Sequence, residues 1–139
     1  MPHLIDTYPF WAHIICEAPA SLNFFLYPSE QLSAPAPQAH ALIKQYSVLL
    51  LVSSLIALIF ALRPLDQTSR NVAAALSLYH LAPSVRALER ILDLDGEEGQ
   101  AYGQRFGGPW AHLLVHSGLC AAFVVLFLVG KTEKLKVKK

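Results

Sequence analysis

Long stretches without charged residues dominate the pattern of hydrophobic and polar positions along this chain. The clearest stretch runs from Tyr46 to Leu62 without Asp, Glu, Lys or Arg, and it ends at Arg63 and Pro64. A second stretch, Pro109 to Gly130, also lacks these four residue types. A helix of about 20 apolar residues is long enough to cross the hydrocarbon core of a bilayer. Both stretches therefore predict membrane spans.

Two further segments are apolar but contain polar positions. The segment at about 9–26 has aromatic residues at both ends, as membrane-interface anchors do. The segment at about 69–92 follows two capping candidates, Asp66 and Thr68, and becomes amphipathic toward Arg86. It either crosses the membrane or lies at the interface, and we expect it to cross.

Composition favours the same class of protein. The chain has 139 residues, of which 54% are hydrophobic and 15% are charged, whereas soluble domains carry roughly 25% charged residues. A soluble fold of this size has too little interior to hide so much apolar surface. We therefore predict an all-α integral membrane bundle of four transmembrane helices that forms a single domain over 1–139. The expected helices lie at about 9–26, 41–62, 69–92 and 109–130.

The distribution of charge predicts an orientation. The formal net charge is +1, but five of the eleven basic residues lie between Lys131 and Lys139. Because basic residues gather on the cytosolic side, we expect both termini and the turn at 63–70 to be cytosolic. The basic tail at 131–139 indicates contact with lipid headgroups and excludes a nucleic-acid footprint.

The last four residues, Lys-Val-Lys-Lys, resemble dilysine retrieval signals of the endoplasmic reticulum. Val137 stands where such a signal has lysine. A polybasic stop beside anionic headgroups is the simpler interpretation of the tail. The endoplasmic reticulum is the membrane that we expect.

Ionisable residues inside membrane helices are costly, and they indicate a functional site. The polar candidates are His13, Glu17, Asn23, His80, Arg86, His112 and His116. A rise of about 1.5 Å per residue places Glu17, His80 and His116 at similar depth near the bilayer midplane. His13 lies four residues before Glu17, and His112 lies four before His116, so each pair projects from one face of its helix. We expect these faces to point inward.

The stretch His13-Ile-Ile-Cys-Glu17 resembles the His-x3-Glu pair on a membrane helix of the emopamil-binding, or EXPERA, group. That group includes sterol Δ8-Δ7 isomerases and the sigma-2 receptor. The resemblance covers these five residues. It implies that His13 and Glu17 move a proton across the double bond of a sterol-like ligand.

The leading hypothesis is a polytopic membrane protein that binds an apolar lipid, sterol or terpenoid in a polar pocket at the midplane. It would isomerise this ligand by proton shuttling through the catalytic pair His13 and Glu17. Contacts to the ligand would come from His80, His116, His112, Arg86 and Asn23. No cofactor is expected in this hypothesis, and the sequence leaves open whether the chain is an enzyme.

Two alternatives use the same polar residues. In the first, the chain is a non-catalytic packing or assembly subunit, whose polar groups join its own helices or a homo- or hetero-oligomer. In the second, the pair His112 and His116 binds a metal ion that Glu17 or His80 completes. A haem held between His80 and His116 is the other form of this second alternative.

Overall fold

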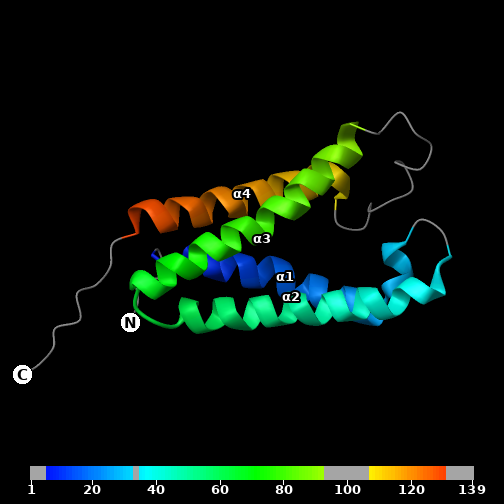
Figure 1. The fold of residues 1–139 in the computed structure, drawn as a ribbon, viewed down its shortest axis with the longest axis horizontal. Coiled ribbons are helices and arrows are strands. Elements are labelled where there is room, and N and C mark those ends of the chain that lie inside the picture. Colours follow the sequence, from blue (N-terminus) through cyan, green and yellow to red (C-terminus); the bar gives the residue numbers. More distant parts are fainter. Residues whose placement is uncertain (1–5, 33–34, 93–106, 131–139) are drawn as a thin grey trace, which may run out of the picture.

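A computed structural model describes residues 6–32, 35–92 and 107–130 of the chain (Figure 1). The described residues fold into four α-helices, and each begins and ends within two residues of its expected range. These helices are α1 (Tyr8–Leu26), α2 (His40–Ala61), α3 (Gln67–Leu92) and α4 (Gly108–Val129). Two short 3-10 helices, η1 (Pro28–Gln31) and η2 (Pro37–Ala39), connect α1 to α2. The all-α fold with four helices is thereby confirmed for the described residues, whereas the basic tail at 131–139 lies outside them.

The helices pair as two hairpins, one made of α1 and α2 and the other of α3 and α4 (Figure 1). Helix α3, which carries the amphipathic segment, packs against α4. The hairpins meet partly through α1 and α4.

The turn between α2 and α3 is built by reciprocal capping. Asp66 Oδ1 accepts hydrogen bonds from the backbone N–H of Ser69 at 2.7 Å and from Ser69 Oγ at 2.9 Å. In return, the Asp66 N–H donates to Ser69 Oγ at 3.4 Å. The carboxylate also pairs with Arg63 across the turn. Of the two capping candidates in the sequence, Asp66 therefore fixes where α3 begins, whereas Thr68 lies within the helix.

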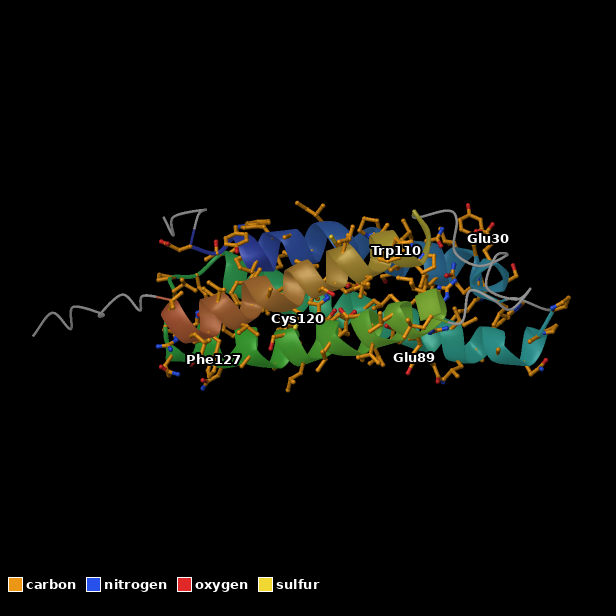
Figure 2. All side chains as sticks on the ribbon, turned by 90° about the horizontal axis from the view of Figure 1, so that it is seen from above. Glu30, Glu89, Trp110, Cys120 and Phe127 are labelled. Carbon is orange, nitrogen blue, oxygen red and sulfur yellow. The ribbon has the colours of Figure 1, made fainter. Side chains whose placement is uncertain are left out.

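Arg70 ties the start of α3 to the end of α4. Its Nε donates to the carbonyl oxygen of Phe127 at 2.7 Å, and its guanidinium lies 5.9 Å from the centre of the Phe127 ring. The last carbonyls of a helix have no partner within that helix. Arg70 therefore satisfies one of them at the end of α4 that Phe127 marks (Figure 2).

An apolar core lies where the hairpins meet. Phe10 stacks on Phe60 with ring centres 5.9 Å apart and meets Phe123 edge to face at 5.4 Å. The fully buried Ala57 and Ala73 belong to the same core. Small residues at these positions let helices approach closely, as they do in membrane bundles.

Large apolar side chains are exposed on the outside of all four helices, while the polar side chains of the middle parts of the helices include several that are buried, such as His13, Glu17 and His80. Ile15, Ile59, Leu78 and Leu114, one from each helix, are 71%, 60%, 69% and 72% exposed. Two described helices are long and apolar enough to cross a membrane, namely the stretch Pro37–Ala61 and α4. The more polar α1 and α3 do not meet the same measure of length and composition.

The capping geometry generates a prediction about Asp66. The backbone N–H of Ser69 chiefly holds the pKa of the Asp66 carboxyl below its ordinary value. The cap is therefore fully stabilising above the ordinary pKa of aspartate, and its contribution is lost as pH falls through the lowered pKa. We expect Asp66→Ala to lower the free energy of unfolding by about 1 kcal/mol at neutral pH. Unfolding in detergent, followed by circular dichroism at a series of pH values, measures this.

Asp66→Asn is the matched control, because asparagine also caps helices but does not titrate. It should keep most of the neutral-pH stability and lose the acid-dependent step. An acid-dependent step of equal size in Asp66→Asn and in the wild type would rule out Asp66 as its source.

Candidate functional site

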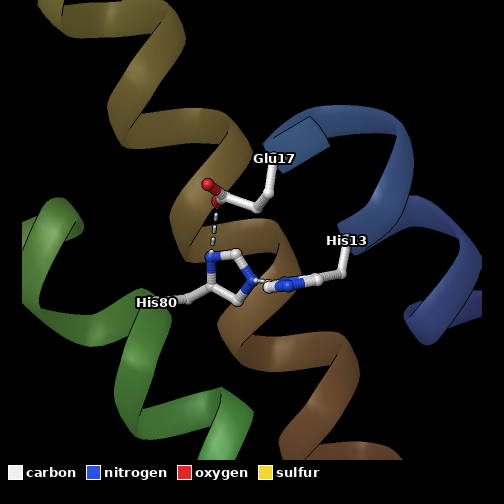
Figure 3. Close-up of side chains that lie close together, drawn as sticks. All are labelled: His13, Glu17 and His80. Carbon is white, nitrogen blue, oxygen red and sulfur yellow. Dashed lines mark hydrogen bonds and ion pairs between the residues drawn. The ribbon is translucent and has the colours of Figure 1, made fainter. Parts of the chain in front are cut away.

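Polar side chains from all four helices meet inside the bundle in a group that we call the His–Glu centre. It comprises His13, Glu17, Ser53, Tyr79, His80 and His116. His13 and His80 are fully buried, and Glu17 is 3% exposed. Each of these residues lies in the middle part of its helix. Figure 3 shows His80 between the two residues of α1, with one ring nitrogen toward Glu17 and the other toward His13.

A chain of hydrogen bonds runs through three histidines. His13 Nε2 lies 3.2 Å from Ser53 Oγ, and His13 Nδ1 lies 2.9 Å from His80 Nε2. His80 Nδ1 in turn lies 2.9 Å from His116 Nδ1. The chain therefore joins α2, α1, α3 and α4 in that order.

The partners of Ser53 fix which nitrogen of each neutral ring carries the proton. Ser53 Oγ donates its only proton to the carbonyl of Leu50 at 2.8 Å, so it accepts from His13 Nε2–H. His13 Nδ1 is then a bare acceptor, and His80 Nε2–H donates to it. The consequence is that His80 Nδ1 carries a lone pair and no proton. That lone pair faces His116 Nδ1.

Glu17 has one satisfied oxygen and one without a partner. The hydroxyl of Tyr79 donates to Glu17 Oε2 at 3.0 Å. Glu17 Oε1 is buried and makes no hydrogen bond, although it lies 3.8 Å from His80 Nδ1 and 3.7 Å from His116 Nδ1. Leaving a buried acceptor unpaired is among the costly arrangements in a protein interior. This oxygen is therefore the chemically open atom of the centre.

Aromatic packing holds the imidazoles in place. The ring of Phe123 stacks on His80 with centres 5.9 Å apart and planes 13° apart. His13 meets Phe123 and Tyr79 edge to face at 6.1 Å and 5.5 Å. These contacts leave the histidines little freedom to turn, so the nitrogen atoms keep their directions.

Three residues that the sequence placed in the pocket lie outside the centre. His112 donates from Nδ1 to the Gly108 carbonyl at 2.8 Å, and its ring stacks on His116 at 6.2 Å. Asn23 accepts a hydrogen bond from Gln31 at 2.9 Å, and Arg86 is exposed. The centre thus uses His13, Glu17, His80 and His116 of the sequence candidates.

Sequence reasoning assigned neither Tyr79 nor Ser53 to the pocket. The bond from Ser53 to the Leu50 carbonyl is present, but the same hydroxyl also receives His13. Neither residue is charged, so a search for ionisable groups passes over both. The one sequence signal that could have pointed to Tyr79 is that it directly precedes His80.

The expected haem geometry does not fit the described side chains. His80 Nδ1 and His116 Nδ1 lie within hydrogen-bonding distance at 2.9 Å. A bis-histidine haem needs an iron and the plane of a porphyrin between two such nitrogens. The rings leave no space for that plane.

No protein-family model, curated protein or solved structure matches the chain in comparisons with known proteins. The resemblance of His13 and Glu17 to the emopamil-binding group, and the isomerisation that it implies, therefore stay predictions. Conclusions about this centre rest on its own geometry.

The hydrogen bond between Tyr79 and Glu17 leads to a second prediction. Tyr79→Phe removes the donor and keeps the ring, so we expect the free energy of unfolding in detergent to fall by about 1 kcal/mol, as for an interhelical hydrogen bond. Tyr27→Phe is the control, because Tyr27 is 50% exposed. Equal unfolding curves for Tyr79→Phe and Tyr27→Phe would show that this hydrogen bond does not stabilise the fold.

Proposed function

We propose that this chain is an integral membrane protein with four spans, whose His–Glu centre binds an apolar lipid, sterol or terpenoid molecule from the bilayer. The expected membrane is that of the endoplasmic reticulum, with both termini in the cytosol. Helix length supports the spans. The helices have 19, 22, 26 and 22 residues, which gives about 28 to 39 Å at 1.5 Å per residue, against a hydrocarbon core of about 30 Å.

The distribution of side chains supports the bilayer as the surrounding medium. Isoleucine and leucine side chains of every helix point outward, and the polar groups are buried at the centre. In water, an apolar surface this extensive would drive association. In a bilayer, the same side chains contact acyl chains, and the ionisable groups avoid lipid by facing one another.

The single observation that carries the binding proposal is the open Glu17 Oε1. It is buried, it has no hydrogen bond, and two imidazole nitrogens lie within 3.8 Å of it. An occupant that brings a polar group to this point removes the cost of the unpaired oxygen. Because the centre is surrounded by helices with lipid-facing exteriors, the rest of such a molecule is apolar. A hydroxyl on a lipid, sterol or terpenoid skeleton meets both requirements.

One observation favours a second function, which is that of a packing or assembly subunit. The hydrogen bonds of the centre join all four helices, from Ser53 on α2 to His116 on α4. Polar groups in membrane bundles often serve only to hold helices together. In that case Glu17 would matter for stability and not for a ligand.

Substitutions at Glu17 distinguish these functions. We expect Glu17→Gln to keep the fold, since an amide still hydrogen-bonds, and to lose most of a lipid that copurifies with the wild type. Glu17→Leu should lower bundle stability by about 1 to 2 kcal/mol. The measurements are mass spectrometry of extracted lipids and unfolding in mild detergent. Glu89→Gln is the control, because Glu89 is exposed on α3 (Figure 2).

Enrichment of one lipid class in the wild type and in Glu89→Gln, with loss in Glu17→Gln, supports the binding function. Equal lipid content in all three proteins would contradict it. Unfolding effects without any change in bound lipid would leave the packing function as the correct one.

The four-span topology is tested by labelling single cysteines from either side of intact membrane vesicles. Cys16 and Cys120 are free and are first replaced by alanine. Thr68, in the first turn of α3, and Ser29, in η1, are exposed beyond opposite ends of α2. We expect Thr68→Cys to react from the cytosolic side and Ser29→Cys only from the other side. Reaction of both from the same side would refute a spanning α2 and the four-span topology with it.

A further inference from the structure

Three atoms of the His–Glu centre form a triangle whose size has a chemical meaning. His80 Nδ1 and His116 Nδ1 are 2.9 Å apart, and Glu17 Oε1 lies 3.8 Å from the first and 3.7 Å from the second. A point equidistant from the three atoms lies about 2.0 Å from each, which is the distance from zinc to histidine nitrogen and carboxylate oxygen in proteins. The triangle therefore has the dimensions of a metal-ligand set.

The protonation of the centre suits a cation at this point. The hydrogen bonds that begin at Ser53 leave His80 Nδ1 as a bare lone pair, as derived above. Glu17 Oε1 has no donor. His116 Nδ1 makes its one hydrogen bond to His80, and the other tautomer of the His116 ring frees this nitrogen as well. Three lone pairs are then available around one point.

Neighbours of His80 and Glu17 form the outer hydrogen bonds that metal sites need. A histidine that binds a metal donates its second N–H to a fixed acceptor, and a ligating carboxylate is itself hydrogen-bonded. His80 Nε2–H donates to His13 Nδ1 at 2.9 Å, and Tyr79 donates to Glu17 Oε2 at 3.0 Å. His13 is held in turn by Ser53. Each of these bonds leaves the inner atom free for the ion.

His13 also offers a nitrogen near the centre, since His13, Glu17 and His80 have ligand atoms within 4.8 Å of one another. We place His13 outside the ligand set. The two lone-pair directions of an imidazole diverge, and one ion reaches only one of them. Glu17 lies on the Nδ1 side of His80, whereas His13 lies on the Nε2 side (Figure 3). His116 is on the same side as Glu17 and completes the set.

We propose that the His–Glu centre binds one divalent transition metal ion of the zinc type through Glu17 Oε1, His80 Nδ1 and His116 Nδ1. Two histidines and one carboxylate with a further position open are typical of catalytic zinc and of non-haem iron sites. Glu17 supplies one negative charge, so the site with its ion would keep a net charge of about +1 and would attract an oxygen donor to the open position. The inference rests on the proposed binding centre, because the ion would hold the polar group of the apolar molecule.

The experiment uses the full chain purified in mild detergent. Metal analysis of the wild type should give about one zinc per chain, the stoichiometry of a single site. After removal of the metal with a chelator, titration with Co²⁺ should produce the visible absorption of a low-symmetry site. His116→Ala should lower the affinity for Co²⁺ by more than about 100-fold, and His13→Ala, outside the ligand set, by about 10- to 100-fold.

Two variants guard against loss of the fold. His116→Cys replaces one ligand by a thiolate, and it should retain Co²⁺ and add a sulfur-to-cobalt charge-transfer band. His112→Ala removes the histidine one turn away on the same helix, which donates to Gly108, and it should bind Co²⁺ like the wild type. Circular dichroism and gel filtration check each protein.

A wild type without zinc that also fails to bind Co²⁺ would overturn the metal site. So would equal Co²⁺ affinity of the wild type and His116→Ala, or a cobalt spectrum of His116→Cys without the thiolate band. Lipid analysis of the same samples separates the two proposals. Bound lipid without metal refutes only the ion, whereas bound metal without lipid refutes only the apolar ligand.

Discussion

The structure depends on one constraint, which is that the carboxyl group of Glu17 lies buried inside a helix bundle. Glu17 is 3% exposed. Tyr79 donates a hydrogen bond to one of its oxygens, and two imidazoles lie near the other. In an apolar interior such a group is tolerated only when it is paired, hydrogen-bonded or bound to a metal. The positions of α1, α3 and α4 around Glu17 follow from this requirement.

Both the apolar core and the polar His–Glu centre hold the two hairpins together. Toward one end, Phe10 and Phe123 pack with small alanines of α2 and α3 and set a close approach of the helices. Phe123 also stacks on His80, so it joins the apolar core to the His–Glu centre. Within a bilayer the apolar contacts give little net drive, because acyl chains are equally apolar. The directional hydrogen bonds of the centre therefore select which helix faces meet.

The sequence was sufficient for the helices and for part of the centre. Charge-free stretches and the Asp66 cap placed the helix bounds, because length and capping are local properties. Depth along each helix brought Glu17, His80 and His116 to one level.

Depth does not give the rotation of a helix about its axis. For that reason Arg86, on the amphipathic part of α3, was expected inside and is exposed. His112 was expected in the pocket, but it finds an acceptor in its own first turn. Tyr79 and Ser53 were missed since their roles depend on tertiary contacts.

Helix α2 contributes no ionisable side chain to the centre, yet it decides the chemistry there. The proton of Ser53 is committed to the Leu50 carbonyl, so the serine accepts from His13, and His13 accepts from His80. This order leaves His80 Nδ1 unprotonated on the side where Glu17 Oε1 also lacks a donor. Two acceptors that face one point repel each other unless something positive lies between them. The orientation of one hydroxyl on α2 thus directs two acceptor atoms, on α1 and α3, toward one point, an arrangement that favours a cation.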